Sequence, residues 1–213
     1  MSEIFEGDII ETNAASQSNN NLSIVCFGAS AGGLEPYLKI LSLLPSETGL
    51  VFIIIHHQPS DWKSLLPEII PHYTQMPVKL VEDGEVAKAN HIYVSPPGMQ
   101  VYMSGDKFRL SPLLKQWGWP RSISAFLHSL ASNHSKHAIA VILSGLDADG
   151  AAALKPIKDA GGIVIAQDFH TAMQPEMPMN AVNTGCVDFL LPPIAIAEKL
   201  QSIAEERHLL KKP

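Results

Sequence analysis

Cysteine is scarce in this chain of 213 residues, and its two copies, Cys26 and Cys186, lie far apart. They form neither a CxxC metal motif nor a disulfide framework. Long apolar runs are lacking as well, because the longest, residues 50–55 and 138–143, are far shorter than the roughly 18 residues that a membrane span needs. We therefore expect a protein that does not insert into a membrane and has reduced thiols in its core.

Positive charge is in short supply, because 15 Lys and Arg stand against 21 Asp and Glu, for a net charge of -6. The scattered basic residues form no stripe for a phosphate backbone, so nucleic acid is not an expected partner. The N-terminal "MSEIFEGDIIETNAASQSNNN" lacks a basic region followed by an apolar one, and is therefore not a signal peptide. We predict a cytoplasmic protein in which residues 1–21 form a flexible polar arm or linker.

From residue 22 onward, short apolar runs alternate with helical patterns, and this alternation predicts parallel strands covered on both faces. We expect strands at 22–28, 50–56, 137–143 and 162–166, with helices at 31–44, 62–73 and 149–160 between them. The expected fold is a single doubly wound, mostly parallel, Rossmann-like α/β sheet, in one domain at 22–210. The stretch "HIYVSPPGMQVYMSGDKFRL" alternates apolar and polar residues around Gly105-Asp106, which predicts a β-hairpin insertion or an antiparallel edge of the sheet.

The turn after the first strand, "GASAGG" at residues 28–33, has too few glycines in the right places for a dinucleotide site. Ser30 occupies the position of the middle glycine, and no Gly-Lys-Ser/Thr follows as in a P-loop. A serine in a tight strand-to-helix turn suits acyl transfer, since free N–H groups nearby, such as that of Ala31, can stabilise an oxyanion. The alternative is that Ser30 only caps the helix.

A serine nucleophile needs a base, and the base needs an acid that orients it. His56 and His57 end the second strand, and Asp147 and Asp149 follow the strand at 137–143, so all four reach the same edge of the sheet. Spacing alone does not choose between the two histidines or the two aspartates, and either aspartate could simply form a turn. A metal site is not expected, because adjacent strand residues point to different faces.

Several separated motifs together resemble the catalytic domain of the CheB-type protein-glutamate methylesterases of bacterial chemotaxis. They are "GASAGGLE", "HHQPSDWKSLLPE", "DGEVAKANHIYVSPP", "VILSGLDADGAAALKPIKDAGGIVIAQD" and "MPMNAV". The version found in methylesterase-methyltransferase fusion proteins is the most similar. The resemblance implies a serine hydrolase that demethylates glutamate methyl esters on chemoreceptors and can deamidate some of their glutamines.

The resemblance also assigns roles, with Ser30 as nucleophile, His57 as base and Asp149, directly before a glycine, as the orienting acid. It implies no metal or organic cofactor, and it implies the cytoplasmic region of methyl-accepting chemotaxis receptors as partner. The further site residues that we expect are Ala31 and Gly32 at the oxyanion turn, and Met177 and Pro178 in the substrate groove.

Three positions depart from the family pattern. Asp147 stands where the family has a small or uncharged residue, and we expect its side chain in solvent; facing inward, it would favour a charged His57 and weaken the base. Ser124 replaces an acid in "PRSISAF", and Met179 replaces a basic residue that follows Met-Pro in other members. The replacement at Met179 is expected to change the affinity for the receptor substrate or the choice of substrate. His56 is expected to pack under a neighbouring helix or to contact ligand.

Typical chemotaxis methylesterases carry an N-terminal receiver domain, which 21 polar residues cannot hold. The resemblance therefore implies an ungated enzyme, gating by a separate receiver protein, or a chain that is part of a longer polypeptide. Two other functions stay open: a catalytically silent signalling scaffold or binding module of the same fold, and a hydrolase of a different ester. A crevice blocked by Trp117 or Trp119, or a contact between Asp147 and His57, would favour the silent module.

Overall fold

A seven-stranded parallel sheet forms the centre of the protein in a computed structural model that describes residues 22–57, 64–113 and 121–209. Every neighbouring pair of its strands runs parallel. The prediction of a doubly wound α/β sheet is confirmed. In spatial order the strands are β3 (Val78–Leu80), β4 (His91–Val94), β2 (Leu50–His56), β1 (Ser23–Ala29), β7 (Ala138–Ile142), β8 (Ile163–Gln167) and β9 (Phe189–Leu191).

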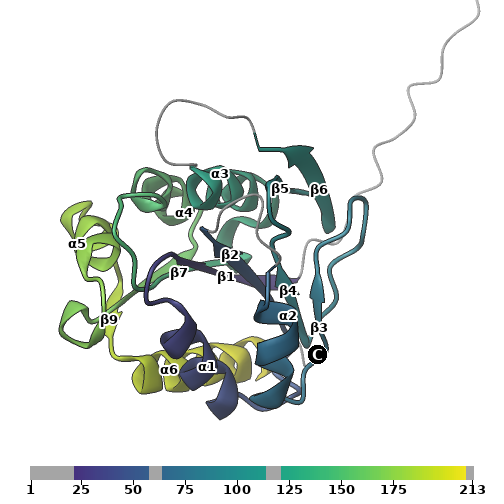
Figure 1. Ribbon diagram of the computed structural model, residues 1–213, viewed down its shortest axis with the longest axis horizontal. Coiled ribbons are helices and arrows are strands. Elements are labelled where there is room, and N and C mark those ends of the chain that lie inside the picture. The colour runs from purple at the N-terminus through teal and green to yellow at the C-terminus, as the bar shows by residue number, and fades with distance from the viewer. Residues whose placement is uncertain (1–21, 58–63, 114–120, 210–213) are drawn as a thin grey trace, which may run out of the picture.

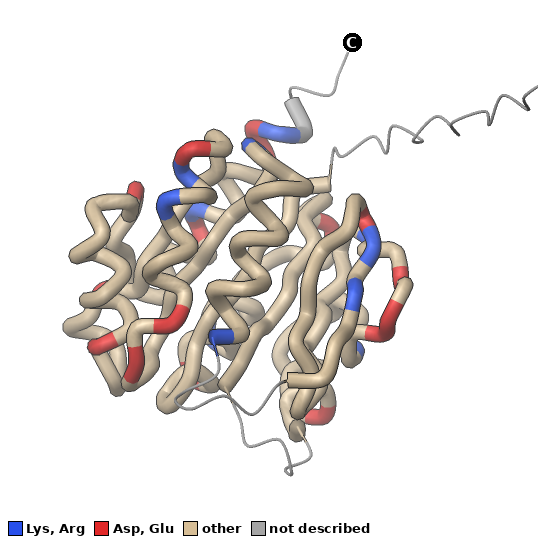
Figure 2. Tube along the Cα trace, turned by 90° about the horizontal axis from the view of Figure 1, so that it is seen from above, with Lys and Arg blue, Asp and Glu red and all other residues tan. Residues whose placement is uncertain are grey.

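The central strands are almost wholly apolar because both of their faces are covered. Side chains alternate along β1, so that Ile24 and Cys26 enter one core while Val25 and Phe27 enter the other. Figure 2 shows the corresponding distribution of charge: β1, β2, β4, β7 and β8 carry no Lys, Arg, Asp or Glu, and the charged residues lie around them.

Two helical layers enclose the sheet (Figure 1). One layer, which covers the core that contains Ile24 and Cys26, consists of α3 (Ser122–His134), α4 (Leu154–Asp159) and α5 (Glu176–Asn183). The other layer consists of α1 (Leu34–Leu43), α2 (Leu66–Ile69) and α6 (Pro193–Leu209). Short 3-10 helices complete the chain at η1 (Ile70–His72), η2 (Ser135–His137), η3 (Ala151–Ala153) and η4 (Phe169–Thr171).

The predicted hairpin is present in the later part of its stretch, as a separate antiparallel pair, β5 (Met99–Ser104) and β6 (Lys107–Pro112). The first part of that stretch, His91–Val94, is instead β4 of the parallel sheet. Gly105, in the two-residue turn, has a positive φ of 57°, as such a turn requires. The hairpin packs on α3, where the Ser129 hydroxyl accepts a hydrogen bond of 2.9 Å from the backbone N–H of Met103. It therefore helps to fix α3, the helix whose beginning borders the site described below.

All three expected helices are shorter than predicted, and the one at 31–44 spans only Leu34–Leu43. The pattern at 62–73 forms only α2 and η1 within the described residues, because Pro67 and Pro71 cannot lie inside a continuous helix. The pattern at 149–160 begins as η3 and becomes helical only at Leu154, after Gly150 with a φ of 89°. Residues 1–21 and the loop with Trp117 and Trp119 lie outside the described part of the chain. Within that part, no helix is long and apolar enough to cross a membrane.

The order of the strands places a topological switch point at β1, since the chain moves from β1 to β2 on one side and β7 lies on the other side. In open α/β sheets, ligands bind outside the carboxyl ends of the strands at such a point. The residues that follow β1, β2 and β7 are therefore the first place to search for a site.

Candidate active site

Ser30 directly follows β1 and is held by two backbone hydrogen bonds. Its N–H donates to the carbonyl of Ser144, just beyond β7, at 3.0 Å, and its own carbonyl accepts from Gly33 at 3.0 Å. The Ser144 hydroxyl also donates to the carbonyl of Ala31 at 2.9 Å. Gly32 has a φ of 76°, and a Cβ there would lie 2.6 Å from Ser144 Oγ. The turn around Ser30 thus depends on glycine and on the neighbouring β7 loop.

The predicted oxyanion donors lie in this turn, between β1 and the start of α1 at Leu34. Among the hydrogen bonds of the described residues, none uses the N–H of Ala31 or Gly32, and none uses the hydroxyl of Ser30. Free N–H groups close to a helix N-terminus favour an anionic ligand. Ala31 and Gly32 as oxyanion donors stay a prediction that this geometry permits.

His57 follows β2 at the same edge, next to Ser30. Ala29 pairs with His56 in the sheet, and the N–H of His57 donates to the carbonyl of Ala29 at 3.1 Å, which extends the ladder by one residue. The imidazole is 4% exposed and lies between two carboxylates. Its Nδ1 is 2.9 Å from Asp147 Oδ2, and its Nε2 is 2.8 Å from Asp149 Oδ2.

Burial alone would lower the pKa of His57, but the hydrogen bonds and negative charges of Asp147 and Asp149 outweigh it and raise the pKa from 6.5 to about 9. A carboxylate can only accept hydrogen bonds, so contacts at both ring nitrogens require both to carry protons. In this geometry His57 is a cation, and neither ring nitrogen is free to accept the proton of Ser30.

Asp149 is the most firmly held member of the site, with a side chain only 3% exposed. Besides His57, its oxygens accept from the N–H groups of Ile123 (2.8 Å), Ser124 (3.0 Å) and Gly150 (2.8 Å) and from the Ser124 hydroxyl (2.6 Å). Burial favours the neutral form, but the hydrogen bonds from His57 and Ser124 prevail and lower its pKa. Asp149 is therefore an anion at the start of α3.

Asp147 does not point into solvent, so that expectation is wrong. Its side chain is 14% exposed, and Oδ1 accepts a hydrogen bond of 2.8 Å from the N–H of Asp149 while Oδ2 contacts His57. The physical reason is the turn itself, since an Asp that accepts from the N–H two residues later is drawn back over its own loop. Of the two outcomes considered for this departure, the inward one occurs.

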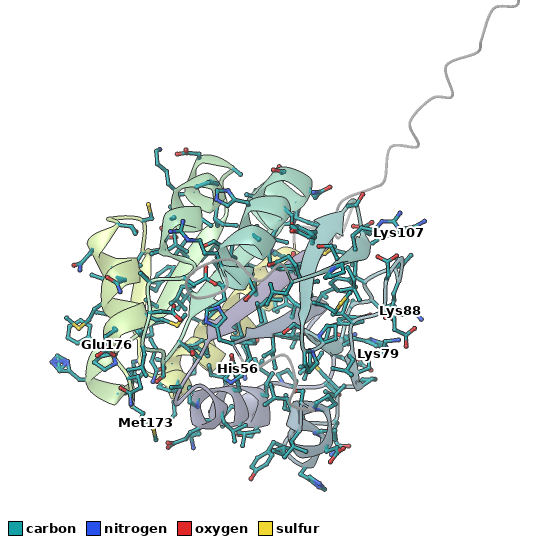
Figure 3. All side chains as sticks on the ribbon, turned by 45° about the horizontal axis from the view of Figure 1, so that its top comes forward. His56, Lys79, Lys88, Lys107, Met173 and Glu176 are labelled. Carbon is teal, nitrogen blue, oxygen red and sulfur yellow. The ribbon has the colours of Figure 1, made fainter. Side chains whose placement is uncertain are left out.

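His56 points away from His57 and packs under α1. The Tyr37 hydroxyl lies 3.3 Å from its Nδ1, and the two rings meet edge to face with centroids 5.9 Å apart. Burial, together with the charge of His57, lowers the pKa of His56 to about 4, so it is neutral. The first of the two expected placements, under a neighbouring helix, is the one found. Figure 3 shows His56 well inside the outline of the molecule.

The two residues predicted for the substrate groove lie in the core. Met177 is 1% exposed and Pro178 is buried, on the inner face of α5. Met177 packs under Gly145, whose carbonyl accepts a hydrogen bond of 3.0 Å from the N–H of Met177. The same segment instead exposes Met173 (68%) and Met179 (45%). Figure 3 shows Met173 and Glu176 at the margin of the molecule. In this geometry Met177 supports the turn at Gly145 from beneath.

The described residues contain no group of three or more His, Cys, Asp or Glu side chains that could hold a metal ion. Cys26 is buried in the core, and both burial and the charge of Asp149 raise the pKa of its thiol. The chemistry offered at this edge is therefore that of a hydroxyl, an imidazole and carboxylates.

The family model for CheB methylesterase matches residues 25–200. The chain belongs to the CheB methylesterase family. It is 30% identical over 183 residues to a putative protein-glutamate methylesterase/protein-glutamine glutaminase of Leptospira interrogans, which covers 84% of this chain and 93% of that protein. The crystal structure of the Thermotoga maritima CheB methylesterase catalytic domain superposes with a TM-score of 0.79 at 28% identity, over 85% of this chain and 98% of that one.

Other relatives are longer than this CheB family member. Protein-glutamate methylesterase/protein-glutamine glutaminase 2 of Methanospirillum hungatei is 31% identical over 196 residues, which cover 91% of this chain and 55% of that protein. The chain thus spans about half the length of that relative. The resemblance stated from the sequence motifs is confirmed, and the Rossmann-like fold that it implied is the fold observed.

One contact of this CheB family member was missed from the sequence. Ser124 was noted only as the loss of an acid, whereas its hydroxyl donates to Asp149 and accepts from the N–H of Gly150 at 2.9 Å. Ser124 lies in the first turn of α3, where free N–H groups gather around an anion, and this position explains the contact.

Proposed function

We propose that this chain is a serine hydrolase that converts glutamate methyl esters of chemoreceptors to glutamate, with Ser30 as nucleophile, His57 as base and Asp149 as the orienting acid. The supporting observation is the meeting of three strand ends, which places these residues at one edge of the sheet with Asp149 2.8 Å from the His57 ring. Because relatives carry both activities in their names, we propose deamidation of receptor glutamines as a second reaction of the same site.

In the proposed first half-reaction, His57 takes the hydroxyl proton of Ser30 while Oγ attacks the ester carbonyl carbon. The negative charge moves to the carbonyl oxygen, where the N–H groups of Ala31 and Gly32 are the proposed donors. Asp149 stabilises the cation that His57 becomes. The bond between the former carbonyl carbon and the methoxy oxygen then breaks, and His57 gives its proton to that oxygen, so methanol departs and an acyl-enzyme remains.

In the second half-reaction, His57 takes a proton from water as the water oxygen attacks the acyl carbon. The bond to Ser30 breaks, Oγ recovers its proton from His57, and a glutamate carboxylate is released. With a glutamine side chain, the first leaving group is ammonia and the remaining steps are the same. No step needs a metal or an organic cofactor.

The proposed partner is the cytoplasmic region of methyl-accepting receptors, which would place the enzyme in the cytoplasm. Exposed apolar side chains near the site support contact with another protein surface: Leu146 (56%) lies in the turn with Asp147, and Met173 and Met179 flank the start of α5. Large apolar side chains that are exposed next to a reactive group favour an interaction site over a free surface.

Methanol release from methylated receptor membranes is the direct test, run with the intact protein, Ser30→Ala and the matched control Ser42→Ala. Ser42 is exposed on α1, where its hydroxyl bonds only to the carbonyl of Lys39 within the described residues. We expect release by the intact protein and by Ser42→Ala, and a loss of at least about a thousandfold with Ser30→Ala. Equal release by all three proteins would refute Ser30 as the nucleophile.

One observation favours a second candidate, a catalytically silent binding module. Both ring nitrogens of His57 face carboxylates, so the base does not serve Ser30 in this geometry. A fluorophosphonate probe, which reacts with activated serines, separates the two candidates. Labelling of Ser30 at any pH between 6 and 10 would exclude the silent module, and absence of both labelling and methanol release would support it. Labelling without methanol release would point to a different ester as substrate.

A further inference from the structure

The contact between Asp147 and His57 has a consequence for catalysis, and the inference drawn from it rests on the proposed function. A histidine acting as base presents one ring nitrogen to the acid that orients it and the other to the nucleophile. Here Asp149 holds Nε2 and Asp147 holds Nδ1, at 2.8 and 2.9 Å. The nitrogen that Ser30 requires is thus the one that Asp147 occupies.

We propose that Asp147 is a positioning residue that competes with Ser30 for Nδ1 of His57 and keeps the enzyme in a protonated resting form at neutral pH. Catalysis then requires that Asp147 leave His57, that Nδ1 lose its proton to solvent, and that the same nitrogen turn to the Ser30 hydroxyl. Asp149 stays on Nε2 throughout.

The surroundings of the two aspartates decide which of them can leave. Asp149 has four hydrogen bonds besides the one from His57, three of them to the backbone, and is 3% exposed. Asp147 has one further side-chain hydrogen bond, from the N–H of Asp149, and it lies between the exposed Leu146 and Ala148. Moving Asp147 disturbs at most two hydrogen bonds, the one with His57 and the one from the N–H of Asp149, whereas moving Asp149 would leave several buried donors without an acceptor.

The charge around His57 is consistent with a resting cation. Within the described part of the chain, the charged groups that face it are Asp147 and Asp149, both from the turn after β7. His56, on its own strand, is neutral, and the contacts from α3 and α5 to these aspartates come from the uncharged Ser124 and Asn180. Removal of Asp147 should therefore lower the pKa of His57 from its value of about 9.

Asp147→Asn is the decisive variant, because it isolates the charge. An amide oxygen can still accept from the N–H of Asp149 and keep the turn, while the NH2 group replaces the oxygen that faces His57. We expect the acid limb of kcat/KM to move at least about one pH unit lower, and activity at pH 7 to rise about tenfold, since one pKa unit is a tenfold change in the fraction of free base.

Asp168→Asn is the matched control. Asp168 also accepts from the N–H two residues later, that of His170, at 3.0 Å, and it also faces that histidine, with 3.3 Å to Nδ1. It thus repeats the local arrangement of Asp147 on the exposed loop of η4. We expect the pH profile of Asp168→Asn to equal that of the unchanged protein, which separates an effect at His57 from the loss of one negative charge.

The protonation of His57 can be measured without any substrate. In an NMR titration of the imidazole signals, with His57→Gln to assign the resonance, we expect His57 to titrate well above 6.5 in the unchanged protein and lower in Asp147→Asn. A His57 that titrates near 6.5 in both proteins would overturn the proposal. So would an acid limb that Asp147→Asn does not move.

Fluorophosphonate labelling of Ser30 separates this inference from the proposed function. Faster labelling of Asp147→Asn at pH 7, without methanol release from receptor membranes, would support the role of Asp147 and refute receptor demethylation. If Asp147→Asn releases methanol and is labelled at Ser30 at the same rates as the unchanged protein, the result would support the proposed function and refute the role of Asp147.

Discussion

Ser124 and Asp149 form a short hydrogen bond, with 2.6 Å between the serine hydroxyl and Oδ1 of the aspartate. The same hydroxyl accepts from the N–H of Gly150 at 2.9 Å, so a single side chain joins the start of α3 to the turn after β7. Both residues are buried. The orientation of the acid that faces His57 therefore depends on a residue that contacts neither the histidine nor Ser30 in the described hydrogen-bond network.

Ser124→Ala should destabilise the protein by about 1–2 kcal/mol, because it removes one hydrogen bond to a charged group and leaves the N–H of Gly150 with only Asp149. The pKa of Asp149 should rise, since one of the donors that lower it is lost. Denaturant unfolding measures the first effect. The control is Ser132→Ala on the exposed side of the same helix, where we expect a change below about 0.5 kcal/mol. Equal stability of both variants would contradict the buried role of Ser124.

Gly145→Ala should destabilise the protein by about 1–3 kcal/mol, because the new Cβ would overlap the sulfur of Met177 and lie 3.1 Å from the Cβ of Ser30. The strain has a defined partner, so Met177→Ala should relieve part of it. In a double-mutant cycle measured by denaturant unfolding, the free energy of unfolding should fall less in the double variant than the two single losses added together. We expect this difference to be about 0.5–3 kcal/mol.

Gly84→Ala combined with Met177→Ala provides the comparison for that cycle. A Cβ at Gly84 would have only an atom of Arg109 within 4 Å, at 3.7 Å. The two effects should therefore add, although Gly84→Ala alone is costly because of its φ of 77°. Additive behaviour of Gly145→Ala with Met177→Ala as well would show that Met177 does not support the turn near Ser30.

The strands β1, β2, β7 and β8 were predictable because they are continuous apolar runs that both layers bury, and this pattern is local in the sequence. The same pattern predicts where these strands end, and therefore which edge of the sheet carries Ser30, His57 and Asp149. The short outer strands β3, β4 and β9 carry too few residues to show this pattern. The direction of Asp147 was not predictable from strand spacing. It depends on a hydrogen bond to the N–H of Asp149 and on the unusual backbone of Gly150, which are properties of the folded turn.

The burial of Met177 follows from the helical period of its segment. Met177, Pro178 and Ala181 are the buried residues of α5, and a spacing of four residues is that of one helix face. This spacing predicts packing of Met177 against the sheet rather than exposure in a groove. The exposed Met179 lies on the other side of the same helix.

The two adjacent histidines should give the unfolding free energy a maximum near pH 6.5. The folded pKa of His57 is about 9 against 6.5 when unfolded, so the folded state binds the extra proton between these values and stability falls as the pH rises through that window. The folded pKa of His56 is about 4, so the unfolded state binds the extra proton between 4 and 6.5, and stability falls as the pH drops.

Denaturant unfolding from pH 4.5 to 8 measures both limbs, since at higher pH the buried thiol of Cys26, whose pKa is also raised, would add an alkaline limb of its own. His57→Gln should flatten the alkaline limb and leave the acid one, whereas His56→Gln should flatten the acid limb only. Asp149 does not confuse the result, because its pKa is lowered from 3.8 and its effect is lost only below this range. If the alkaline limb persists in His57→Gln, His57 is not held as a cation between its two carboxylates. That outcome would contradict the raised pKa of His57.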